Sequence, residues 1–163
     1  MKALLSPTST SPSPLSGSIE LRFMGDPAPQ GSKIVTRWGT MREASKKVEP
    51  WRAVVQYQAE QQYKGPVLEG PVSIDVVFVF VRAKNHWSTA KGKEDQLLPS
   101  APVHHTKAPD LDKLLRGILD PLTTRCGGCV LKDDSQVIEI RSRKRYATAH
   151  EWAGALVRIT PVR

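Results

Sequence analysis

The sequence predicts a single α+β domain with a mixed or antiparallel sheet and two main helices. Three observations support this fold class. A chain of 163 residues is about the size of one domain. Apolar residues alternate with a period of two in some segments and recur with helical spacing in two others. Strands and helices are mixed along the chain in the order β, α, β, α, β, β, with no internal repeat.

The domain is expected to begin with a half-buried strand over residues 18–25. Ile19, Leu21 and Phe23 alternate there with charged residues, which is the period of a strand with one buried face. Prolines and a glycine in residues 26–31 then indicate a turn.

Residues 33–47 are basic and predict a short hairpin around Trp38. Cations beside an aromatic side chain suit an arm that contacts phosphates while the indole stacks on a base. A solvated basic loop explains the same residues equally well. The candidate DNA contacts in this segment are Lys33, Arg37, Lys46 and Lys47.

A helix is expected over residues 49–63, because Pro50 suits a first turn and apolar residues follow at helical spacing. Residues 71–81 form the clearest strand. Its far end is apolar on both faces, which predicts a central position in the sheet. The residues on its core face are Ile74, Val76, Phe78 and Phe80.

The second half of the chain begins with a long polar loop, residues 83–107, which is either a DNA-facing flap or a mobile segment. A second helix is expected over residues 111–124, with Pro121 bending or closing its end. Two strands, residues 135–146 and 154–162, complete the domain. The apolar stripe of the helix is Leu111, Leu114, Leu115, Ile118, Leu119 and Leu122.

The charge balance favours an anionic partner. Lys and Arg number 24 against 16 Asp and Glu, a formal net charge of +8, and nucleic acid is the commonest such partner. A protein that is merely basic is the alternative. No apolar run approaches the roughly 20 residues that span a bilayer, so we expect a cytoplasmic protein without a membrane partner. Residues 1–17 are rich in Ser and Pro and predict a disordered tail, leaving residues 18–163 as the domain.

The two cysteines, Cys126 and Cys129, form a CGGC motif. A disulfide scaffold would need more cysteines, and a zinc site would need two further ligands at a recognisable spacing. A redox pair is possible, although no thioredoxin-like pattern surrounds it. A tight Gly-Gly loop without special chemistry is the favoured interpretation.

The residues that point to chemistry are aspartates. Asp110 and Asp112 are two apart where the second helix begins, so both side chains point the same way in an extended entry segment. Within the helix, Asp112, Arg116 and Asp120 follow at i+4 spacing and form a polar line opposite the leucine stripe.

Asp133 and Asp134 precede a strand. In a small domain, a strand that pairs beside the helix could bring one of these two aspartates close to Asp110 and Asp112. Two carboxylates about 4 Å apart repel by about 4 kcal/mol at an effective dielectric of 20. A divalent cation removes that cost, and carboxylates select Mg²⁺ or Mn²⁺. Such a metal can activate water and hold a phosphate. The alternative is that these aspartates only cap helices and form turns.

The aspartate motif resembles that of the RusA family of endonucleases, which resolve Holliday junctions in bacteria and phages. The motif is Asp110-Leu111-Asp112, Leu114, Arg116, Asp120 and Leu122, followed by Asp133-Asp134-Ser135-Gln136-Val137. The PAPQGSK segment (residues 27–33) and the RKRY segment (residues 143–146) also resemble the family. The resemblance covers residues 19–160.

This resemblance implies a homodimeric, Mg²⁺-dependent enzyme whose metal is held by Asp110, Asp112 and Asp134. Paired symmetric nicks would resolve a four-way junction. A lysine of the family motif falls at Arg116, which keeps the charge but cannot release a proton. Lys113 and Lys132 lie nearby and could substitute as the proton donor.

A hypothesis about the mechanism follows, motivated by the aspartate spacing and the basic surplus. Arg116 would steady the negative charge, and Asp133 or Asp120 would orient the metal ligands. Lys107 and Arg143 join the expected DNA backbone contacts. Three rivals remain: a binding module without catalysis, a metal-dependent nuclease for flaps or RNA, and a phage adaptor that is basic by accident.

Overall fold

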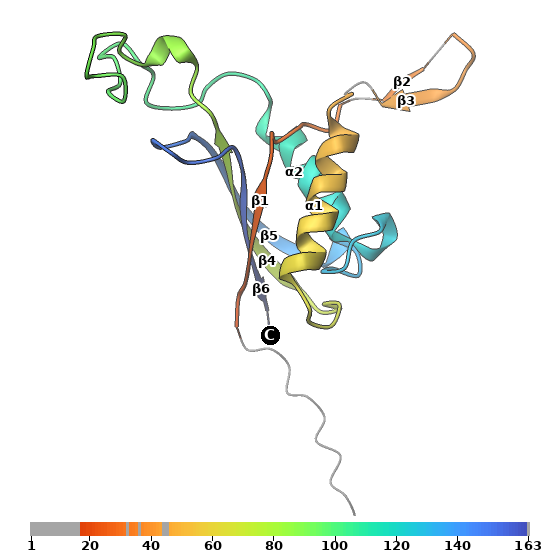
Figure 1. Ribbon diagram of the computed structural model, residues 1–163. Helices are drawn as coiled ribbons and strands as arrows, with labels where there is room; N and C mark the ends of the chain where they lie inside the picture. The colour runs from red at the N-terminus through yellow and green to blue at the C-terminus, as the bar shows by residue number, and fades with distance from the viewer. Residues whose placement is uncertain (1–16, 32, 36, 44–45, 163) are drawn as a thin grey trace, which may run out of the picture.

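The computed structural model describes residues 17–31, 33–35, 37–43 and 46–162. One four-stranded sheet has two helices packed on a single face (Figure 1). The strands are β1 (Ile19–Met24), β4 (Val72–Phe80), β5 (Val137–Tyr146) and β6 (Gly154–Pro161), and the helices are α1 (Val48–Gln62) and α2 (Leu111–Leu119). The predicted tail falls outside the described residues, apart from Gly17.

The sheet has the order β1-β6-β4-β5 and is mixed. β4 pairs with β5 in parallel and with β6 antiparallel, and β6 pairs antiparallel with β1. The prediction of an α+β domain with a mixed sheet is therefore confirmed, as is the central position of residues 71–81.

The core lies between the sheet and the helices. Alternate residues of β4 (Ile74, Val76 and Phe78) are at most 1% exposed, because their side chains lie beneath the helices. The helices bury one apolar stripe each against this face. The fully or nearly buried residues of these stripes are Trp51, Val55, Ala59, Leu114 and Ile118.

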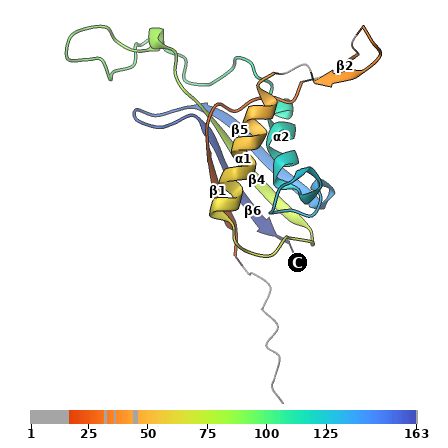
Figure 2. The ribbon, with the colours of Figure 1, turned by 45° about the vertical axis from the view of Figure 1, so that its right-hand side comes forward.

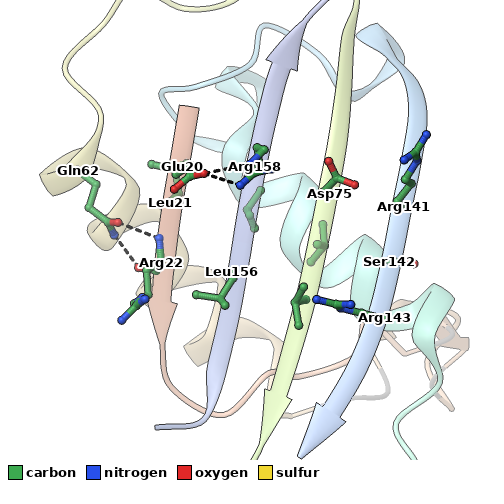
Figure 3. A pocket seen from close by; sticks show the side chains of 13 residues that line it. Glu20, Leu21, Arg22, Gln62, Asp75, Arg141, Ser142, Arg143, Leu156 and Arg158 are labelled. Carbon is green, nitrogen blue, oxygen red and sulfur yellow. Dashed lines mark hydrogen bonds and ion pairs between the residues drawn. The ribbon is translucent and has the colours of Figure 1, made fainter. Parts of the chain in front are cut away.

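The opposite face of the sheet carries mostly charged side chains (Figure 3). Arg158 of β6 donates to Glu20 of β1 at 2.7 Å. Asp75 and Arg141 lie in the same row across β4 and β5. The alternation of apolar and charged residues in these strands thus separates a buried helix face from an open face.

The predicted hairpin is confirmed. β2 (Lys33–Val35) pairs antiparallel with β3 (Met41–Glu43) as a separate two-stranded sheet. It extends away from the main sheet at the end where α1 begins (Figures 1 and 2). Residues 83–107 also extend from that end, as the green segment of Figure 1 shows.

Two predicted boundaries are wrong. The second helix ends at Leu119 rather than Thr124 and continues as 3₁₀ turns, η2 (Asp120–Leu122) and η3 (Thr124–Cys126). Pro121 explains this end, because it has no N–H to donate into the α-helical ladder. β5 begins at Val137 rather than residue 135, since η4 (Asp134–Gln136) forms a turn before it.

Candidate functional site

The start of α2 presents two carboxylates to solvent. Asp110 occupies the N-cap position in extended conformation, but its side chain makes no capping hydrogen bond. Instead the carboxylate lies 2.9 Å from the ammonium of Lys113. Helix capping therefore does not explain why an aspartate occupies position 110.

Asp112 lies in the first turn of α2 and is exposed. Among the described residues, no hydrogen bond or ion pair ends on its carboxylate. The ammonium of Lys113 holds the pKa of Asp110 below its usual value, by hydrogen bonding first and by charge second. Asp110 is therefore ionised at neutral pH, which is the form that binds a cation.

Asp134 lies at the other end of β5 from this pair. Lys144, late in β5, donates to the carbonyl of Pro109 at 2.8 Å, so Asp110 lies near that end of the strand. Val137 begins β5 directly after the turn that holds Asp134. Lys144 is seven steps along the strand from Val137, about 23 Å at roughly 3.3 Å per residue. Consistent with this, no three His, Cys, Asp or Glu side chains in the described chain could together hold a metal.

Asp133 has a structural role in the turn before β5. Its carboxylate accepts a hydrogen bond from the Ser135 N–H at 2.9 Å, and its own N–H donates to the Gln136 side chain at 2.8 Å. These bonds form a capping box, and the bond from Ser135 lowers the pKa of Asp133. The sequence offered two roles for Asp133, orientation of the metal ligands and formation of a turn, and the structure shows the turn.

Asp120 lies at the far end of α2 from Asp110, about 15 Å away at roughly 1.5 Å per residue. Its carboxylate accepts from the guanidinium of Arg52 in α1 at 2.5 Å. The structure therefore joins Asp120 to the other helix and does not bring it to Asp110 and Asp112.

The cationic candidates fall on two sides of the molecule. Arg116 is exposed one turn after Asp112 on α2, as the i+4 spacing predicts. Lys107 is exposed just before the aspartate pair, whereas Arg143 lies on the open face of the sheet (Figure 3). Lys132 lies 3.3 Å from Glu69 and does not contact Asp110.

The hairpin carries the remaining cationic candidates. Trp38 is 83% exposed, and the Arg37 guanidinium lies 5.8 Å from its ring centre. Lys46 and Lys47 are exposed at the start of α1. The side chain of Lys33 lies outside the described residues.

Sequence reasoning missed Lys144. Its ammonium donates to the backbone carbonyls of Lys107 at 2.6 Å and Pro109 at 2.8 Å, on either side of the cis Ala108–Pro109 peptide. A signal was present in the alternation of β5, which places Lys144 opposite the buried Phe78 and so on the helix side of the sheet.

The two cysteines are free. Gln56 donates to the carbonyl of Cys126 at 2.5 Å, and burial raises the pKa of the half-buried Cys129. This raised pKa is the opposite of what an activated thiolate requires. No helix in the described chain is both long enough and apolar enough to cross a bilayer.

The domain has a sheet with one open face and two exposed carboxylates at the start of α2, and a basic hairpin extends from the same end. These features fit the class of nucleases. The family model Endodeoxyribonuclease RusA matches residues 24–160. The chain therefore belongs to the RusA family and is an endodeoxyribonuclease of a family that resolves Holliday junctions. A comparison with curated proteins gives no match.

Proposed function

We propose that the protein is a Mg²⁺-dependent homodimeric resolvase that cuts four-way DNA junctions by paired symmetric nicks. Mn²⁺ would substitute for Mg²⁺. The observation that supports this best is the pair of exposed carboxylates at the start of α2, Asp110 and Asp112, of which Asp110 holds the N-cap position without a capping bond. Its setting would be the cytoplasm of a bacterial or phage-infected cell.

The donor set suits a hard divalent cation. Asp110 and Asp112 offer carboxylate oxygens, and Asp112 has no hydrogen bond or ion pair to give up within the described chain. A cation held there would supply Lewis acidity for phosphodiester hydrolysis. Arg116, one turn further along α2, would offset negative charge on the phosphate. Lys113, whose ammonium lies beside Asp110, would donate a proton to the leaving oxygen.

Asp134 is the third proposed ligand, and a second copy of the chain would supply it. β5 is an edge strand of ten residues, and β4 is its one neighbour among the strands of the described residues. Its Ile138 and Ile140 are 63% and 40% exposed, which is unusual for an unpaired edge. A two-fold axis that sets two such edges antiparallel would place the partner copy's β5 start beside the end where Asp110 lies.

Most of the proposed DNA contacts lie at the end of the molecule where α2 begins with the aspartate pair (Figure 2). The hairpin and residues 83–107 extend from that end and would track the phosphate backbone of the junction arms (Figure 2). Arg143, on the open face, would contact a different part of the DNA. The proposed contacts are Lys33, Arg37, Lys46, Lys47, Lys107 and Arg143.

Cleavage of a labelled four-way junction tests this function. The protein is incubated with the junction and with a linear duplex of the same sequence, in Mg²⁺ or in chelator. We expect symmetric nicks in the junction alone, lost with chelator and in Asp112→Asn. Tight junction binding without cleavage under any divalent metal would make the protein a binding module. Equal cleavage of flaps or RNA would remove the preference for four-way junctions.

Mixing two inactive variants tests whether a second copy supplies Asp134. A dimer of one Asp112→Asn chain and one Asp134→Asn chain keeps one intact site only if Asp134 acts across the interface. We expect each variant alone to be inactive and the mixture to recover part of the cleavage. An inactive mixture of chains that exchange subunits would place all three ligands in one chain.

A further inference from the structure

Lys144 binds the segment that delivers Asp110 to the end of the sheet. Its side chain is half-buried on the helix side of β5. The ammonium donates to the carbonyls of Lys107 and Pro109, and charge-assisted hydrogen bonds of this kind are about twice as strong as neutral ones. Pro109 directly precedes Asp110, so the second bond acts one residue away from the carboxylate.

The same segment has little else to hold it. The carbonyls of Lys107 and Pro109 bond to Lys144. Within the described chain, the backbone of residues 106–109 makes no other hydrogen bond. Pro109 has no N–H with which to join a backbone ladder. The path of the chain into α2 therefore depends on this ammonium.

A ring contact anchors the segment a few residues earlier. The His105 ring stacks on Phe80 with centroids 4.3 Å apart and lies 4.9 Å from Tyr146. Phe80 and Tyr146 are paired residues at the ends of β4 and β5. The chain is thus fixed to the sheet at His105, and Lys144 holds the last residues before Asp110.

Lys144 differs from Lys113 in how it acts on Asp110. Lys113 contacts the carboxylate itself. Within the part of the chain that the structure describes, the ammonium of Lys144 bonds to carbonyls alone, and its charge lowers the pKa of Asp110 less than Lys113 does. A cation that binds Asp110 would displace the Lys113 ammonium from the carboxylate, whereas the Lys144 ammonium would keep its bonds to the two carbonyls.

We propose that Lys144 is a positioning residue that fixes Asp110 and Asp112 in the arrangement that receives the metal. This inference rests on the proposed function, because it concerns the same two carboxylates. Residues that orient metal ligands are typically worth 10- to 100-fold in metal affinity. Loss of the ammonium should therefore weaken metal binding about ten-fold or more while the core remains folded.

The first test is hydrogen exchange of the metal-free, full-length protein. We compare wild type with Lys144→Met, Lys144→Arg and Lys64→Met; Lys64 is an exposed lysine after the far end of α1 and matches the loss of charge. The reporters are two hydrogen-bonded amides at the start of α2: the Leu114 N–H, which donates to the Asp110 carbonyl, and the Gln30 N–H, which donates to the Lys113 carbonyl. Faster exchange of these two amides is expected in Lys144→Met, with a smaller effect in Lys144→Arg and none in Lys64→Met. Unchanged exchange at both amides would overturn the inference, as would faster exchange throughout the sheet.

The second test is the Mn²⁺ affinity of the same four proteins, measured by titration. We expect about ten-fold weaker binding in Lys144→Met, partial recovery in Lys144→Arg and wild-type affinity in Lys64→Met. Equal affinity in all four would overturn the positioning role. If wild type itself binds no Mn²⁺ and cuts no junction, the proposed function fails, and the exchange result still decides whether Lys144 holds the segment.

Discussion

The guanidinium of Arg52 in α1 lies 2.5 Å from the carboxylate of Asp120 at the end of α2. Both side chains are less than a third exposed, so the pair joins the two helices on the rim of the core. The sequence offered Asp120, as an alternative to Asp133, as a residue that orients the metal ligands, and it placed Asp112, Arg116 and Asp120 on one helix face. The spacing was correct, but it could not reveal which residue of another helix faces Asp120.

Asp120→Asn should therefore lower stability without changing metal affinity. Removing one charge of a partly buried pair costs about 1–2 kcal/mol, or about 2–8 °C in melting temperature for a domain of this size. Glu49→Gln is the matched control, because Glu49 is the other, 71% exposed partner of Arg52 and should cost far less. A normal melting temperature with weakened Mn²⁺ binding in Asp120→Asn would return this residue to the metal site.

Lys113→Arg separates charge from proton donation beside Asp110. Arginine keeps the positive charge next to the carboxylate but does not release a proton at neutral pH. We expect junction binding to remain near wild type and single-turnover cleavage to slow about 100-fold, as for loss of a general acid. An unchanged cleavage rate would mean that Lys113 acts only through its charge.

Gly117→Ala should destabilise the protein, although alanine favours helices. In an open helix the change gains about 1 kcal/mol. Here a β-carbon would overlap the carbonyl oxygen of Ala28, because the turn after β1 lies directly on α2. We expect a net loss of about 1–3 kcal/mol in the free energy of unfolding, measured in urea. A stabilised variant would show that this turn does not lie on α2 in solution.

The loop between β5 and β6 should be sensitive to acid through Glu151. Two hydrogen bonds from Arg145, each 2.6 Å long, do most to lower the pKa of Glu151, which falls to about 2 from its ordinary value of 4.5. A depressed carboxylate pKa adds stability above about 4.5, which is lost as the pH falls towards 2.

Glu151→Gln should accordingly cost about 1–2 kcal/mol at pH 7, after allowance for solvent screening. The difference from wild type should shrink between pH 4.5 and pH 2, as followed by chemical unfolding. A difference that stays constant over that range would show that the variant acts by packing rather than by charge.

Local pattern was enough to predict the main elements of the fold. Alternation identified β1 and β4, and the leucine stripe identified α2, because each pattern reflects which side chains face one core. The exact ends were harder, since Pro121 and the Asp133 capping box act through local backbone bonds that periodicity does not record.

The candidate site was only partly predictable. The pair Asp110 and Asp112 could be found from its spacing, whereas Asp134 was expected beside it and lies at the opposite end of β5. Chain order does not fix that separation, because it depends on the direction in which β5 runs beside α2. The alternation of β5 places Lys144 on the helix side of the sheet, but it does not reveal that the partners of this lysine are backbone carbonyls.

The most direct test of the account uses a supercoiled plasmid that extrudes a cruciform, incubated with wild type or Asp112→Asn in Mg²⁺ or chelator. Paired nicks within one encounter convert the circle directly to a linear molecule, whereas single nicks leave an open circle. We predict linear product from wild type in Mg²⁺ and none from Asp112→Asn or in chelator. Linear product from Asp112→Asn at the wild-type rate would contradict the assignment of catalysis to the aspartates at the start of α2.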